Sequence, residues 1–244
     1  MPKISLKKQQ IKQREEDILK AALILIENTG FGSLKMDQLA QQSGCTKGTL
    51  YNHFINKEDL LCELGVLYCH EQMRLYQRLD SYAGNSREKV MALFLAYQIF
   101  SFSNKGLFSC VLHIQSDAQM ERASAQRLAV YREAEMALVM RIVSAIQLGL
   151  DQGDIESHHQ SNVLQLAFTG WATAFGNIAL MMSSQGAFLT QQADREAQLL
   201  SATQFMLDGL AWRPLSTDKD YQKSWTEIGN TFFNQELLML RKQN

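Results

Sequence analysis

Hydrophobic residues recur every three or four positions along nearly the whole chain. Near its start, Ile18, Ala22 and Ile26 lie on one stripe, and most of the neighbouring charged residues lie off it. This spacing is typical of an amphipathic helix, which we predict over residues 9–28. Gly30 follows and suits a left-handed helix cap, because glycine adopts positive φ without a steric penalty.

Three shorter segments come next, and their apolar residues are Met36, Leu39, Ala40, Leu50 and Phe54. The spacing predicts helices over about 36–43 and 47–53 and another that begins near Lys57. Thr46 and Asn56 directly precede the last two. Their side-chain oxygens can accept from backbone N–H groups one turn on, so we expect both to be N-caps.

The rest of the chain shows the same period and no alternating strand pattern. It has only two prolines, Pro2 and Pro214, so long helices are permitted almost everywhere. We therefore predict an all-α protein. The expected later helices lie at about residues 57–80, 86–103, 106–114, 117–151, 158–184, 190–212 and 218–241.

Charge is distributed unevenly, although the net charge is only −1. Residues 1–14 carry five basic side chains and no acidic one. Residues 1–60 carry nine basic and seven acidic residues, whereas residues 61–244 carry fifteen and eighteen. The net charge alone therefore does not indicate a nucleic-acid binder, but the positive charge is gathered at the start.

Cysteine usage indicates reduced thiols and no metal site. Cys45, Cys62, Cys69 and Cys110 form no CxxC pair, and no histidine cluster completes a zinc spacing. We expect no cofactor. The first 30 residues lack the apolar core of a signal peptide, and the longest apolar run, residues 90–97, is too short to span a bilayer. These features predict a cytoplasmic protein that does not enter a membrane.

Residues 36–54 have the organisation of a helix-turn-helix. Two short helices flank Gly44-Cys45-Thr46, and Leu50 and Phe54 would anchor the second helix to the protein. Its other side chains then lie on the outer face and at the ends. Hydroxyls, an amide and an imidazole can reach phosphates or base edges there, and a lysine attracts phosphate whatever the base sequence. These outer residues are Lys47, Thr49, Tyr51, Asn52 and His53.

Residues 14–61 closely resemble the DNA-binding domain of TetR-type transcriptional regulators. The resemblance is carried by Met36-Asp-Gln-Leu-Ala40, Ser43-Gly44-Cys-Thr46-Lys-Gly48-Thr-Leu-Tyr51-Asn-His53-Phe54 and Lys57-Glu-Asp-Leu-Leu61. It implies a DNA-binding domain over residues 1–60. It also implies a helical effector-binding and dimerisation domain over residues 61–244, which here has an extra C-terminal helix.

The resemblance also implies roles for single residues. Gly48 would let the recognition helix approach the DNA backbone, and Lys57 would hold a phosphate together with nearby amides. Lys35 stands where the family usually has a threonine, and it could itself reach a phosphate. The residues that would meet DNA are Thr46, Lys47, Thr49, Tyr51 and His53.

Each of these residues also has a plainer interpretation. Taken alone, Tyr51 would be a packed aromatic, His53 a structural histidine, and Lys47 and Lys57 solvated charges. The joint spacing, rather than any one residue, favours DNA binding.

A dimer would let two such heads read two half-sites. The segment 162–183 is apolar nearly all round, with one polar row, and small residues such as Ala174 would allow another helix to approach. We predict that it forms the dimer contact, with a core helix inside one subunit as the alternative. The resemblance implies that residues 158–184 and 190–212 form this contact with their copies.

The resemblance further implies a small-molecule effector pocket among the aromatic, sulfur-containing and histidine residues of the middle of the chain. A plain core is the alternative interpretation for each of them. The predicted pocket residues are Tyr97, Phe100, Phe108, Cys110, His113, Trp171 and Phe175.

The resulting prediction is a dimeric, ligand-responsive repressor that a small molecule releases from double-stranded operator DNA. Activation instead of repression stays open. An enzyme is disfavoured, because the sequence has no GxSxG, HExxH, P-loop or dinucleotide-binding motif, so we name no catalytic residue. A helical adaptor that binds protein instead of DNA is the other alternative, but it leaves the basic start and the CTKGTLYNHF segment unexplained.

Overall fold

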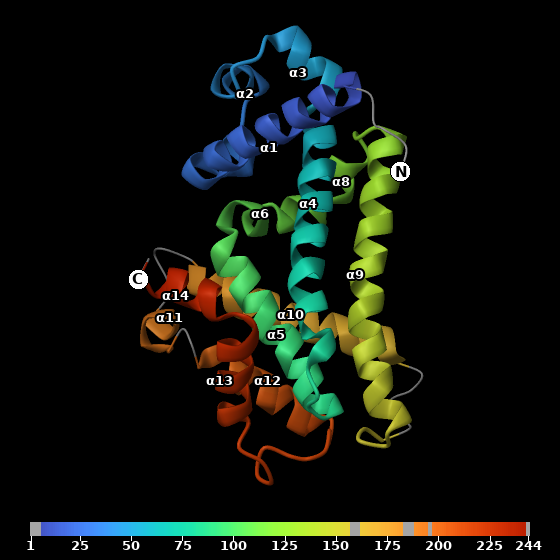
Figure 1. Ribbon diagram of the computed structural model, residues 1–244, viewed down its shortest axis with the longest axis vertical. Helices are drawn as coiled ribbons and strands as arrows, with labels where there is room; N and C mark the ends of the chain where they lie inside the picture. The colour runs from blue at the N-terminus through green and yellow to red at the C-terminus, as the bar shows by residue number, and fades with distance from the viewer. Residues whose placement is uncertain (1–5, 157–161, 183–187, 195–196, 243–244) are drawn as a thin grey trace. The chain divides into compact units, whose positions relative to one another are not determined.

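The described residues of the protein, 6–156, 162–182, 188–194 and 197–242, form helices joined by turns and contain no strand (Figure 1). This computed structural model confirms the predicted all-α class. Contacts divide the chain into two compact units. The first unit comprises Met1–His70 and Asn104–Glu135, and the second comprises Glu71–Ser103 and Met136–Asn244. These contact units do not test the functional domain boundary expected at residue 60, which stays a prediction.

The first unit begins with three helices, α1 (Leu6–Ser33), α2 (Met36–Gln42) and α3 (Lys47–His53). α3 has the predicted bounds. α1 kinks at Gly30, where φ is 77°, so the positive φ expected there is confirmed. α1 contacts α2, and α2 contacts α3. Apolar side chains from all three helices are buried, namely Ile18, Ala22, Ile26, Leu39, Ala40 and Leu50.

The rest of the first unit comes from the first part of α4 (Lys57–Arg78), from α6 (Lys105–Ser109), α7 (Val111–Ile114) and α8 (Asp117–Met120), and from the start of α9 (Ala125–Asp151). α6 lies against α1. A Cβ at Gly106 would lie 3.0 Å from Cγ of Glu27. The lack of a side chain at this position therefore allows the close approach.

The second unit is built around α5 (Ser86–Ser103), which has the predicted bounds and is buried at nearly every position from Ser86 to Ser101. It contacts α10 (Val163–Met182), α12 (Gln198–Gly209), α13 (Tyr221–Phe232) and α14 (Asn234–Lys242). The short elements η1 (Leu79–Ser81) and α11 (Phe188–Gln192) complete the unit. A helix contacted from so many directions explains why residues 90–97 are an unbroken apolar run.

Two buried charges of α5 tie the C-terminal part of the chain to this core. Arg87 is fully buried, and its guanidinium donates to Asp208 at 2.7 Å and to the carbonyl of Trp212 at 2.7 Å. Glu88 accepts from the hydroxyl of Ser224 at 2.6 Å and pairs with Lys219 at 2.8 Å. Burial alone would raise the pKa of Glu88, but these partners hold it below its usual range.

Several predicted helices are shorter or interrupted. The expected helix 117–151 is broken before α9, where the backbone N–H of Ser124 donates to Asp59 at 2.7 Å. The expected helix 218–241 is two helices, because the backbone leaves helical geometry at Phe233, with φ −136° and ψ 20°. The spans 106–114 and 190–212 are likewise each divided into two helices. The ends of the span 158–184, including His158 and His159, fall outside the described residues.

Candidate nucleic-acid interface

The turn between α2 and α3 is held by local hydrogen bonds. Gly44 has φ 65°, a conformation that glycine adopts at little cost. The hydroxyl of Ser43 donates to the carbonyl of Leu39 at 2.8 Å, and the amide of Cys45 donates to the carbonyl of Ala40 at 3.0 Å. The turn therefore leads directly into α3 with few unsatisfied backbone groups.

Thr46 caps α3, as predicted. Its side-chain oxygen accepts from the backbone N–H of Thr49 at 3.1 Å, and the two threonine hydroxyls lie 2.9 Å apart. Asn56 caps α4 in the same way, with its Oδ1 accepting from the N–H of Asp59 at 2.8 Å. Both predicted caps are confirmed, so the start of each helix is specified locally.

Burial separates the two faces of α3. Leu50 and the following Phe54 are both 0% exposed, whereas Tyr51 is 46% exposed. Thr49 is half-buried. Among the residues predicted to meet DNA, Thr46, Lys47, Gly48 and Asn52 are also exposed. The plainer interpretation of Tyr51 as a packed aromatic does not fit this exposure.

Lys47 provides a positive charge on the exposed face of α3, and in the free protein it forms an ion pair within the chain. Its Nζ donates to Oδ2 of Asp37, in the first turn of α2, at 2.7 Å. The hydrogen bond and the charge of Asp37 raise the pKa of Lys47. Both side chains are well exposed, 65% and 62%. An exposed pair of this kind contributes little to stability, so it can open to serve another anion.

Lys57 and Lys35 lie at the starts of two other helices. Nζ of Lys57 donates to the carbonyl of Gly32 at 3.0 Å and lies 4.4 Å from the centre of the Phe31 ring. Burial lowers the pKa of Lys57. Lys35 directly precedes α2, is exposed and makes no side-chain capping bond. Lys35 could therefore reach outward freely, whereas Lys57 would have to exchange its carbonyl partner for a phosphate.

His53 is not with the exposed residues, contrary to the expectation that it lies on the outer face. Its side chain is only 11% exposed, and Nδ1 lies 3.6 Å from a carboxylate oxygen of Glu15 on α1. The side chain of this last residue of α3 therefore lies beside α1 and is largely shielded from solvent. Here the structural interpretation of the histidine describes its position better.

Arg127 of α9 joins the C-terminal end of α3 to two other helices. Its guanidinium pairs with Glu15 at 2.7 Å and with Glu63 of α4, and it donates to the backbone carbonyl of His53 at 3.1 Å. Burial alone would lower the pKa of Arg127, but the two carboxylates outweigh burial and raise it. The guanidinium also lies 5.0 Å from the Phe54 ring.

Sequence reasoning missed Arg127, because it lies 74 positions from His53 and belongs to no motif. The turn before α9 is further held by Asn56, whose side-chain amide donates to the carbonyl of Arg122 at 2.8 Å. α9 therefore helps to position the end of α3 and the start of α4.

A cavity in the second unit lies between α5, α10 and α12 and the parts of α4 and α9 that belong to that unit. It is partly open to solvent. Aromatic side chains provide much of its wall: Tyr76, Phe94, Tyr97, Trp171 and Trp212.

Only two of the predicted pocket residues, Tyr97 and Trp171, line this cavity. Phe100 of α5 and Phe175 of α10 are not among its lining residues. Phe108, Cys110 and His113 belong to the first unit. There His113 lies 5.0 Å from the Phe31 ring, and burial raises the pKa of Cys110 to about 12. The structure therefore does not gather the seven predicted residues around one cavity.

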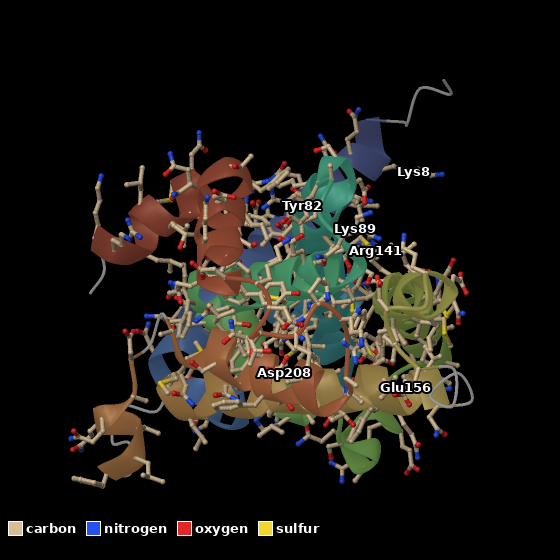
Figure 2. The ribbon with its side chains drawn as sticks, turned by 90° about the horizontal axis from the view of Figure 1, so that it is seen from below. Lys8, Tyr82, Lys89, Arg141, Glu156 and Asp208 are labelled. Carbon is tan, nitrogen blue, oxygen red and sulfur yellow. The ribbon has the colours of Figure 1, made fainter. Side chains whose placement is uncertain are left out.

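A second, more polar cleft of the same unit contains Tyr82, Lys89 and Arg141 (Figure 2). Arg141 donates to Oδ1 of Asp80 at 2.6 Å across this cleft. Leu93 lines both the cavity and this cleft. Among the described residues, no group of three or more His, Cys, Asp or Glu side chains could hold a metal ion.

Comparison with known proteins agrees with this architecture. Residues 18–64 match the family model described as bacterial regulatory proteins, tetR family. A curated relative, the HTH-type transcriptional repressor KstR2 of Mycobacterium tuberculosis, is 24% identical over 120 residues, which are 49% of this chain and 55% of the relative. The chain thus spans about half the length of the curated relatives it matches.

Solved structures share the fold over most of the chain. The TetR family regulator PfmR from Thermus thermophilus superposes with a TM-score of 0.60, at 18% identity, over 79% of this chain and 98% of that one. FadR from Bacillus subtilis, solved with stearoyl-CoA, gives 0.60 at 17% identity over 80% and 98%. The family-model match over residues 18–64 confirms the resemblance to tetR-type regulators drawn from the sequence, and the solved structures show a shared fold.

The two faces of α3 should respond differently to truncation. We expect Leu50→Ala to lower the free energy of unfolding by about 2–5 kcal/mol, because it removes a fully buried side chain. Tyr51→Ala should change it by no more than about 0.5 kcal/mol, as is usual for exposed positions. Chemical denaturation followed by circular dichroism measures both. A loss of similar size at Tyr51 would show that its ring is packed.

Arg127 should stabilise the first unit through its carboxylate partners. Arg127→Met keeps most of the side-chain length but leaves Glu15 and Glu63 without their cation, so we expect a loss of about 1–3 kcal/mol. Arg132→Met, an exposed change on the same helix, is the control. A double-mutant cycle with Glu63→Gln isolates the pair. Additive effects in that cycle would argue against a coupled pair.

Proposed function

We propose that this protein is a DNA-binding transcriptional regulator whose α3 enters the major groove of an operator. The observation that carries the proposal is the division of α3 into a fully buried side, Leu50, and an exposed polar side with Lys47 and Tyr51. Seven helical residues extend about 10 Å, which fits a groove about 12 Å wide. The tetR-type match over residues 18–64 supports the same role.

In this proposal the exposed residues have different roles in DNA recognition. Thr49, Tyr51 and Asn52 face base edges or nearby phosphates, and Thr46 and Gly48 lie at the helix start, where the backbone can approach closely. Lys35, Lys47 and Lys57 contribute phosphate attraction that does not depend on base sequence. His53 acts indirectly, because its side chain is held beside Glu15.

We also propose that two subunits associate through the second unit. α10 is apolar and long enough to cross a membrane by length and composition, yet only 22% of its most apolar window is buried. Leu164 and Phe168 of α10 are 66% and 63% exposed, and Phe205 of α12 is 78% exposed. A second copy would cover these side chains in a cytoplasmic dimer.

Ala174, which sequence reasoning placed in the dimer contact, faces the other way. It is 1% exposed and lines the cavity. The inner side of α10 is thus a core surface, and in this proposal its outer side forms the interface.

Regulation by a small molecule completes the proposal. The cavity wall is mainly apolar, as is usual for small-molecule sites, and the structurally similar FadR was solved with stearoyl-CoA. An effector would release the operator only if it bound the DNA-competent and DNA-incompetent states with different affinity. Repression is the favoured mode, because the Mycobacterium tuberculosis relative is a repressor.

The direct test is a gel shift against the DNA that flanks the protein's own gene. We expect sequence-specific binding, and Lys47→Ala should reduce the slope of log affinity against log salt by about 0.9, the share of one phosphate contact on duplex DNA. Lys223→Ala, an exposed lysine of the second unit, is the control. Failure to bind any flanking DNA specifically would favour the protein-binding adaptor instead.

The proposed interface predicts the effect of a buried charge. Phe168→Glu should reduce the molar mass measured by light scattering from about twice 27.7 kDa to about 27.7 kDa, because a carboxylate without a partner is costly to bury. Leu112→Glu alters an equally exposed apolar residue, 68%, in the first unit, and should leave the mass unchanged. A Phe168→Glu protein that remained dimeric would place the interface elsewhere.

A further inference from the structure

The cavity wall contains one polar atom that the protein itself does not satisfy. Gln72 of α4 is 2% exposed and lines the cavity. Its Nε2 donates to the hydroxyl of Tyr76 at 2.7 Å, and its Oε1 is buried without a hydrogen-bond partner. A buried carbonyl oxygen without a donor is unfavourable. Its position in a cavity wall suggests that a ligand supplies the donor.

The rest of the wall restricts the charge of that ligand. Apart from Gln72, the described lining residues are aliphatic or aromatic side chains and a glycine, and none of them carries a charge. An ion placed among them would lose its hydration and gain no counter-charge. The cavity therefore favours a neutral molecule, and a carboxylate would be disfavoured in it.

Tyr76 adds a second hydrogen-bonding group beside Gln72. Its phenol oxygen accepts from Gln72, and its own proton remains available to donate. Burial raises the pKa of Tyr76 well above the physiological range, so the phenol keeps that proton. A ligand hydroxyl could therefore donate to Oε1 of Gln72 and accept from Tyr76 at once, whereas an ether could only accept.

Aromatic walls and a close approach at Gly170 indicate the shape of the ligand. Phe94, Tyr97 and Trp171 offer ring faces and edges against which another ring can pack. A Cβ at Gly170 would lie 3.1 Å from Cζ of Phe94. A larger residue at this position would therefore take up space beside the Phe94 ring, and the glycine leaves that space to the cavity.

We propose that the effector is an uncharged, ring-containing molecule with a hydroxyl group that donates to Oε1 of Gln72. This inference rests on the proposed function, because it assigns the effector's chemical class to the cavity of that regulator. It goes further in naming the residue that selects among neutral ligands. Gln72 would act by favouring a hydroxyl over the same molecule without a donor.

Isothermal titration calorimetry of the full chain without DNA tests this proposal with three probes of one ring system. They are 2-naphthol, its methyl ether 2-methoxynaphthalene, and the anion 2-naphthoate. We expect 2-naphthol to bind about tenfold more tightly than the ether, the ratio that one hydrogen bond supplies. Binding of 2-naphthoate should be weaker than that of both neutral probes.

Gln72→Met removes the carbonyl while keeping an unbranched side chain, and it should reduce the ratio between naphthol and ether to about one. Gln77→Met makes the same change at an exposed position of α4 and should leave the tenfold ratio intact. A ratio that survives in Gln72→Met, equal binding of both neutral probes by the unaltered protein, tightest binding of 2-naphthoate, or no binding of any probe would each overturn the proposal.

Failure of the inference can be told apart from failure of the proposed function. Calorimetry is carried out without DNA, and operator binding is measured without any probe. A protein that binds its operator but does not discriminate naphthol from the ether remains a regulator with a different effector chemistry. A protein that discriminates the probes but binds no DNA keeps the ligand site and loses the regulatory role.

Discussion

Burial of Leu50 and Phe54 is the constraint on which the candidate interface depends. A seven-residue helix is too short to be stable alone, so α3 exists because these side chains are held in the core of the first unit. The same burial fixes which side of α3 remains exposed. The Thr46 cap determines where the helix begins, and Arg127 holds the carbonyl of its last residue, His53. Anchoring of the apolar side thus positions the polar side.

Two helices supply residues to both the candidate interface and the cavity. α4 contributes Glu63 to the Arg127 cluster and Gln72 to the cavity wall, and α9 contributes Arg127 itself and Ile146. Each of these helices is one continuous stretch of chain. A ligand that favours one arrangement of them at the cavity therefore also acts on the helices that carry Glu63 and Arg127. In our account, release of DNA follows from such differential binding, and the neutral, aromatic wall determines which molecules can cause it.

The sequence predicted features that depend on neighbouring residues more accurately than features that depend on distant ones. α3, its cap and the α4 cap are specified by residues within a few positions of one another, so local rules were sufficient. The Arg127 cluster, the Asp59 contact that delimits α9 and the two sides of α10 depend on tertiary partners far along the chain. Ala174 shows the limit most clearly, because periodicity locates an apolar helix but cannot say which side meets its own core.

The central claim is that two copies of α3 read one operator, and hydroxyl-radical footprinting tests it most directly. On DNA bound specifically by the protein, we expect two protected patches whose centres are separated by about one helical turn, roughly 34–36 Å, or a multiple of it. Both patches should disappear together with Phe168→Glu, which removes the second subunit and leaves α3 unchanged. A single patch, or two patches that persist in a monomeric variant, would contradict the account.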